Sequence, residues 1–154
     1  MQLSTLIKPE AVKVFGKMSS KKRLFQEIGD VAAAAYGLSS SEVVDALQER
    51  ESLGPTGVGH GVALPHARLP HLEKVRGAFI RLEKPLEFGA VDRQPVDLIF
   101  ALFAPLDSGV DHLKALALVS RTLRDATVCT KLRANIDPAT LYTVLTEGQA
   151  SQAA

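Results

Sequence analysis

The chain has 154 residues, of which 46% are hydrophobic and 23% charged, the balance of a globular domain long enough to bury a sizeable core. Its net charge of +1 gives no electrostatic reason to expect a nucleic acid or an anionic membrane as a partner. The single cysteine, Cys129, excludes an internal disulfide and a cysteine-based zinc site, and no run approaches the ~18 apolar residues of a membrane span.

The first and last residues of the chain support one expectation each. The opening, MQLSTLIKPEAV, lacks the basic segment and long apolar core of a signal peptide, so we expect a cytoplasmic protein. Residues 148–154 are small and polar, which predicts a flexible tail. Residues 1–147 are then predicted to form a single domain.

One strand and two helices are predicted in the first third of the chain. Residues 11–16 alternate apolar and polar side chains, as a short strand does. The pair Ser19-Ser20 can cap a helix over residues 21–36, which would stop at Gly37. A second helix opens at Ser40 or Ser41 and runs to about Glu51.

The middle of the chain has the pattern of a sheet. Strands are predicted over residues 59–64, 76–82 and 97–103. The third of these, DLIFALF, is almost entirely apolar, as a strand covered on both faces would be.

The last third is predicted to be helical. Asp107 or Ser108 is the expected cap of a helix that runs to about Arg124, and further helices are expected over residues 126–133 and 138–145. Helices therefore flank the strands on both sides in the sequence. This favours an α/β fold, with a mixed sheet of about five strands sandwiched between helices.

The stretch GPTGVGHGVALPHAR, residues 54–68, places four glycines within eight residues. It lacks the lysine of a phosphate loop, and its GxGxG core leads into a predicted strand where a dinucleotide-binding fold needs a helix. The glycines indicate either a tight turn or a backbone that approaches a ligand closely. The pattern alone leaves both interpretations open.

Three histidines in this region, His60, His66 and His71, do not have the spacing of a zinc site. An extended strand rises roughly 3.3 Å per residue, so His60 and His66 would lie about 20 Å apart. His66 follows Pro65 at the end of a predicted strand, where sites on α/β sheets are built, and an imidazole there can act as a base or nucleophile. A surface histidine in a loop fits the same position.

His112 lies on the apolar face of a predicted helix. It lines up with Leu116, Val119 and Leu123, so it is expected to point towards the sheet from the first helical turn, where anions are favoured. A core histidine with its hydrogen bonds satisfied is the commoner explanation of such a position. If it converges with His66, the two form a pair suited to phosphoryl or acyl transfer.

The segment LQERESLGPTGVGHGVALPHARLPHLEKV resembles the active-site segment of the enzyme IIA components of the bacterial phosphotransferase system, of the fructose/mannitol type. RQPVDLIFALFAP and HLKALALVSRTLRD fit the same family, and the similarity covers about residues 2–147. Within this family the chain is most similar to the nitrogen-related branch of free-standing regulatory phosphoproteins. The family's fold, a mixed sheet between helices, agrees with the predicted elements.

The resemblance implies a role for each residue of the site. His66 would accept the phosphoryl group on Nε2, His112 would be the supporting histidine, and Arg50 would stabilise the phosphoryl oxygens. The expected phosphate-binding turn, with backbone N–H groups and one hydroxyl near these oxygens, consists of Thr56, Gly57 and Gly59.

The resemblance also implies the partners. A histidine-containing phosphocarrier protein would donate the phosphoryl group, and no cofactor or metal is implied. Two roles stay open: a regulatory phosphoprotein read by targets such as kinases or potassium transporters, and a metabolic carrier that passes phosphate to the IIB component of a sugar transporter. His60 replaces an asparagine of many nitrogen-type members, and we expect it to tune the charge of the site rather than to react.

Overall fold

The computed structural model describes residues 1–147 in full and the backbone of the last helix to Ala153. The predicted flexible tail, residues 148–154, lies outside the part described in full. The helices are α1 (Leu3–Leu6), the 3-10 turn η1 (Pro9–Ala11), α2 (Lys21–Tyr36), α3 (Ser40–Ser52), α4 (Gly109–Arg124), α5 (Ala126–Arg133) and α6 (Pro138–Ala153). The strands are β1 (Val12–Phe15), β2 (Gly57–Gly59), β3 (Val62–Ala63), β4 (His66–Leu69), β5 (Arg76–Leu86) and β6 (Val96–Pro105).

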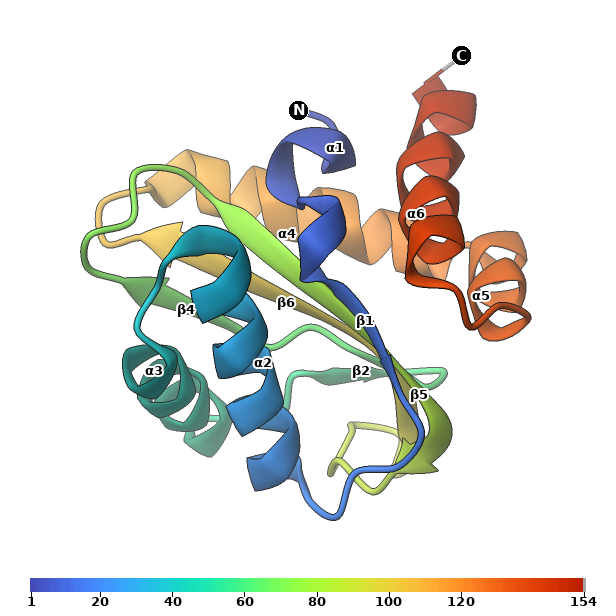
Figure 1. Ribbon diagram of the computed structural model, residues 1–154, viewed down its shortest axis with the longest axis horizontal. Helices are drawn as coiled ribbons and strands as arrows, with labels where there is room; N and C mark the ends of the chain where they lie inside the picture. Colours follow the sequence, from blue (N-terminus) through green and yellow to red (C-terminus); the bar gives the residue numbers. More distant parts are fainter. Residues whose placement is uncertain (154) are drawn as a thin grey trace.

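The six strands form one mixed sheet in the order β1-β5-β6-β3-β2, with β4 also paired to β6. β5 and β6 are antiparallel at the centre, β1 runs parallel to β5, and both β3 and β4 run parallel to β6. Helices α2 and α3 cover one face, α4 lies behind the sheet, and α5 and α6 lie to the right of the sheet in this view (Figure 1). The predicted fold class, a mixed sheet sandwiched between helices, is confirmed.

The predicted strand over residues 59–64 is wrong. The chain forms a hairpin there instead, because His60 and Gly61 both adopt left-handed backbone angles, with φ of 57° and 79°. Two consecutive residues with positive φ are what a two-residue hairpin turn requires. A Cβ at Gly61 would also lie 2.5 Å from Nη2 of Arg133, so the tip of the hairpin packs closely against α5.

Strand β4 was not predicted, because Pro65 suggests an end to extended structure. The chain does leave the ladder at Leu64 and Pro65, but it returns to the same neighbour. Val62 pairs with Leu98, and His66 pairs with Leu102 four residues further along β6. The carbonyl of Pro65 accepts a hydrogen bond from the N–H of Leu102, so the proline, which has no N–H to donate, still bonds to β6.

The helix caps follow the sequence in part. The Ser20 hydroxyl accepts the N–H of Arg23 at the start of α2, and Gly37 ends that helix in the left-handed region. Ser39 caps α3, one residue before the expected pair. Ser108 occupies the cap position of α4, as one of the two predicted caps, although its hydroxyl makes no capping bond.

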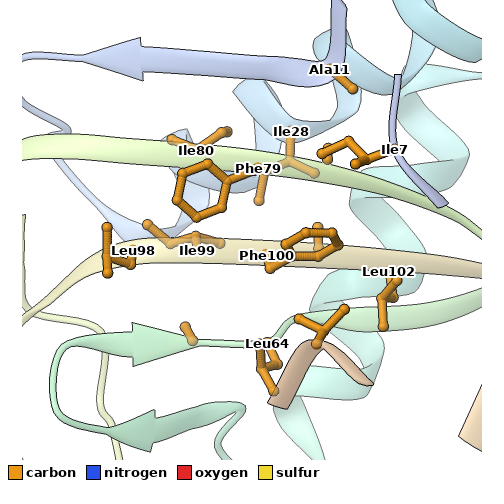
Figure 2. Packing of buried hydrophobic residues seen from close by; sticks show 14 of the residues in the cluster. Ile7, Ala11, Ile28, Leu64, Phe79, Ile80, Leu98, Ile99, Phe100 and Leu102 are labelled. Carbon is orange, nitrogen blue, oxygen red and sulfur yellow. The ribbon is translucent and has the colours of Figure 1, made fainter. Parts of the chain in front are cut away.

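The core lies on both faces of β5 and β6. Phe79, Ile80, Ile99 and Phe100 are fully buried at the centre of the sheet, in one hydrophobic cluster that also includes Ile28 of α2 (Figure 2). Burial on both faces explains why β6 is nearly all apolar. Among the described residues, no helix has the length and apolar character needed to cross a membrane.

Candidate active site

His66 opens strand β4, next to the central strand β6. Its ring Nδ1 lies 2.8 Å from the carbonyl oxygen of Leu64, two residues earlier. A carbonyl only accepts, so this contact assigns the proton to Nδ1 and leaves a lone pair on Nε2. The Leu64 carbonyl thus holds neutral His66 in one tautomer, with its lone pair on Nε2.

Arg50, in the last turn of α3, reaches that same nitrogen. Its Nε lies 3.3 Å from Nε2 of His66, and its Nη1 donates to the carbonyl of Gly54 at 2.9 Å. The guanidinium is therefore held by the turn that follows the helix and is directed at Nε2 of His66. A planar cation in this position is suited to the oxygens of a phosphoryl group bound to Nε2.

His112 meets His66 from the first turn of α4. The two ring centroids are 5.5 Å apart, and the rings are inclined by 68°. His112 is 7% exposed and packs inward with Ala115 and Val119, whereas Leu116 of the predicted face is only partly buried. Its Nε2 is buried and has no hydrogen-bond partner among the described residues. A buried polar atom without a partner is costly, and a ligand oxygen at this position would satisfy it.

Both imidazoles are biased towards the neutral form. Burial lowers the pKa of His66, and the Arg50 cation lowers it further, although the Leu64 carbonyl and Glu51 act in the opposite direction. Burial also lowers the pKa of His112, helped by its neighbours His66 and Arg68. A neutral imidazole keeps its lone pair at neutral pH, so His66 is prepared to act as a nucleophile.

Thr56 lies in the turn after α3, where Glu51 binds it. The Glu51 carboxylate accepts the N–H of Thr56 at 3.0 Å and also its hydroxyl. The same carboxylate forms an ion pair with Lys21 of α2 at 3.1 Å. The structure thus gives the Thr56 hydroxyl a partner within the protein, and its role towards phosphate stays a prediction.

Gly57 and Gly59 pack against the loop between β5 and β6. A Cβ at Gly57 would lie 2.6 Å from the Cβ of Ala90, and Gly59 has a φ of 104° beside the Asp92 carboxylate. Close approach to this loop and left-handed backbone therefore require these two glycines. Their expected contact with phosphate also stays a prediction.

Two residues near the site were not singled out from the sequence. Glu51 follows Arg50 and fixes the turn in which Thr56 lies. Arg68 shares the strand face of His66, and its Nη1 donates to the Leu106 carbonyl, 3.2 Å away, in the loop that leads to α4. The alternation of side chains along a strand was the available signal for Arg68, but it requires β4 to be predicted first.

The other two histidines of this region, His60 and His71, are not part of this pair. The carbonyl of Gly61 accepts N–H groups from Asp97 and Leu98, four to five residues before the partner of His66 on β6. At roughly 3.3 Å per residue, the hairpin tip carrying His60 lies about 13 Å or more away. His71 follows β4 and lines a separate surface groove with Tyr36 and Arg76.

The arrangement combines a neutral nucleophile, a cation beside its lone pair, and a buried imidazole with an unpartnered nitrogen. These are the parts that transfer of a phosphoryl group needs, since that reaction depends on positioning and on donors to the oxygens. Among the described residues, no group of three or more histidine, cysteine, aspartate or glutamate side chains is arranged to hold a metal ion.

Comparison with known proteins matches this chain to one family and to several similar proteins. The sequence model of the family described as phosphoenolpyruvate-dependent sugar phosphotransferase system, EIIA 2, matches residues 5–148. A nitrogen regulatory protein of Bradyrhizobium diazoefficiens is 48% identical over 145 residues, 94% of this chain and 95% of the relative. One from Klebsiella oxytoca is 42% identical over 148 residues, 96% of this chain and 91% of the relative. The crystal structure of nitrogen regulatory protein IIA-Ntr from Neisseria meningitidis superposes with a TM-score of 0.86 at 33% identity, covering 94% of this chain and 99% of that one.

Proposed function

The chain belongs to the EIIA 2 family of the phosphoenolpyruvate-dependent sugar phosphotransferase system, and on that premise we propose that it reversibly accepts a phosphoryl group on Nε2 of His66. The observation that carries the proposal is the set of contacts of that imidazole. Nδ1 is engaged by the Leu64 carbonyl, Nε2 accepts from the Arg50 guanidinium, and the His112 ring lies beside the His66 ring with 5.5 Å between centroids.

The donor is a phosphohistidine of a histidine-containing phosphocarrier protein. The lone pair of His66 Nε2 attacks phosphorus in line with the bond to the donor nitrogen. That P–N bond breaks, and its electron pair returns to the donor imidazole. His66 keeps its proton on Nδ1, so the transfer needs no proton to leave this ring.

Arg50 and His112 stabilise the negative charge of the transferred phosphoryl group. When Nε2 of His66 becomes bonded to phosphorus, the Nε–H of Arg50 loses its present acceptor and gains the phosphoryl oxygens beside it. With its proton on Nε2, His112 donates to a second oxygen and thereby gains the partner that it lacks. Both groups are in place before the reaction, so they stabilise charge as it develops.

The protein acts as a regulatory phosphoprotein in the cytoplasm. Phosphorylation replaces a neutral ring at the edge of the sheet with a group of about two negative charges, a change that a target protein can read. The support for regulation is the name shared by the relatives, nitrogen regulatory protein, at up to 48% identity over most of this chain. The targets that the family implies are kinases or potassium transporters.

Phosphoryl transfer from a phosphoenolpyruvate-driven phosphocarrier tests this function. We expect one acid-labile, base-stable phosphoryl group per chain, absent in His66→Ala and retained in His60→Ala and His71→Ala. Full labelling of His66→Ala would refute the assignment. Incubation of the labelled protein with candidate IIB components separates the two roles: rapid loss of the label to one of them would establish the metabolic role in place of regulation.

A further inference from the structure

A second concave site lies away from the histidine pair, in the corner between the β2–β3 hairpin and helices α4 and α5. It has a volume of about 620 Å³, and Arg50, His66 and His112 do not line it. Its apolar lining includes Val62 and Leu64. The volume is in the range of pockets that bind small molecules, ~300–1,000 Å³.

The polar lining of this groove includes two cations besides the side chains of His60, Ser120 and Thr130. Arg124 and Arg133 line it, and no carboxylate of the described residues does. Arg133 is already bonded to Asp97 at 2.9 Å and to the His60 carbonyl at 2.8 Å. Arg124, at the exposed end of α4, forms no ion pair with any described residue. A guanidinium without an ion pair to any described residue, in a groove also lined by Val62 and Leu64, complements a molecule with an apolar body and a single carboxylate.

Leu64 links the groove to the histidine pair. Its side chain lines the groove, its N–H donates to the Thr56 carbonyl at 2.9 Å, and its own carbonyl accepts Nδ1 of His66 at 2.8 Å. Helix α4 makes a second link, because Leu123 lines the groove three turns after His112. A bound molecule would contact both segments that hold the two imidazoles.

We propose that this groove binds a small amphipathic carboxylate, whose apolar body packs against Leu64 and Leu123 and whose carboxylate bonds to Arg124. Binding fixes Leu64 and, through its carbonyl, the orientation of the His66 ring. The effect on His66 as a phosphoryl acceptor rests on the proposed function, whereas binding itself does not.

Titration with hexanoate tests the site, followed in ¹⁵N-labelled protein by NMR. Hexanamide keeps the apolar body without the charge, and acetate keeps the charge without the body. We expect hexanoate to shift the amide signals of residues 58–64 and 120–130, and to bind about tenfold more tightly than hexanamide because of the charge-assisted bond. Acetate should not saturate. Equal affinities for hexanoate and hexanamide, or shifts confined to other segments, would overturn the proposal.

A matched pair of variants locates the carboxylate. Arg124→Gln should abolish the preference for hexanoate over hexanamide. Arg121→Gln removes the same charge one turn earlier on α4, where the side chain is exposed and does not line the groove, and it should keep the preference. If both variants lose the preference for hexanoate over hexanamide to the same extent, the cause is a general effect of net charge, and the assignment to Arg124 is refuted.

Cys129 supplies an independent readout, because it is the only cysteine and lines the groove. Burial raises the pKa of its thiol, so it should react slowly with iodoacetamide. Hexanoate at about nine times its Kd should slow this reaction about tenfold, since only the free fraction reacts. No protection at saturation would refute the site. Hexanoate should also bind His66→Ala normally, so failure of the groove and failure of His66 as acceptor are separate results.

Discussion

Arg50→Ala removes two contacts of the proposed active site at once. The guanidinium donates to Nε2 of His66 at 3.3 Å and to the Gly54 carbonyl at 2.9 Å. In the transition state, the first of these donors has moved to a phosphoryl oxygen, where it faces a full negative charge. The substitution should therefore affect the rate of transfer more than the stability of the fold.

The sizes of the effects on the transfer rate and on stability follow from these contacts. A hydrogen bond to a charged group contributes about 1.5–3 kcal/mol, which corresponds to transfer slowed roughly tenfold to a hundredfold. Loss of the Gly54 contact, in a half-buried turn, should lower the free energy of unfolding by about 1 kcal/mol, a small part of the ~5–15 kcal/mol typical of a domain. Arg50→Lys keeps the charge without the planar fork and should give an intermediate rate.

Quenched-flow transfer from a phosphorylated phosphocarrier measures the rate, and urea unfolding measures the stability. Arg23→Ala is the matched control, because it removes an exposed helical arginine that forms an ion pair, 2.6 Å long, with Glu27 on the same helix, α2. This control should transfer at the wild-type rate. If Arg50→Ala also accepts the phosphoryl group at that rate, with an unchanged unfolding curve, Arg50 does not contribute to transfer.

Three further results are expected. Phosphorylation should raise the pKa of His112, measured by NMR titration, because an anion then lies beside it. His112→Gln should slow transfer less than His112→Ala, because glutamine still donates a hydrogen bond. If the His112 signals titrate identically in both forms, the two histidines do not share one site. Glu51→Gln should lower the pKa of His66 further, since that carboxylate raises it; an increase would contradict this. Burial lowers the pKa of both histidines from 6.5 in the folded protein. The free energy of unfolding should therefore be highest above pH 6.5 and should fall as the pH drops through the lowered pKa of each histidine. Urea unfolding curves that do not change over this pH range would contradict the expectation.

The elements best predicted are those whose ends carry their own signals. Helix α2 has the expected bounds because Ser20 caps its first turn and Gly37 adopts the left-handed angle that ends it. Strand β6 was recognised because burial on both faces requires an unbroken apolar run. In both cases a local pattern corresponds to one structure.

The hairpin and β4 were missed because their cause is not local. The sequence GVGHGVALPHAR fits one strand as well as two, and only the pairing of both β3 and β4 with β6 decides between them. The contacts within the site are likewise not encoded in any local pattern. An apolar helical face indicates that His112 points inward, but no pattern reveals that Arg50 reaches Nε2 of His66 across sixteen residues, or that Glu51 engages Thr56.

The central claim is that phosphorus becomes bonded to Nε2 of His66. ³¹P and ¹⁵N NMR of the phosphorylated protein, labelled in its imidazole nitrogens, reads this bond directly through the phosphorus–nitrogen coupling. Because the Leu64 carbonyl holds the proton on Nδ1, we expect the coupling at Nε2 of His66, with Nδ1 still protonated. Coupling at Nδ1 of His66, or at a nitrogen of His60, His71 or His112, would contradict the account.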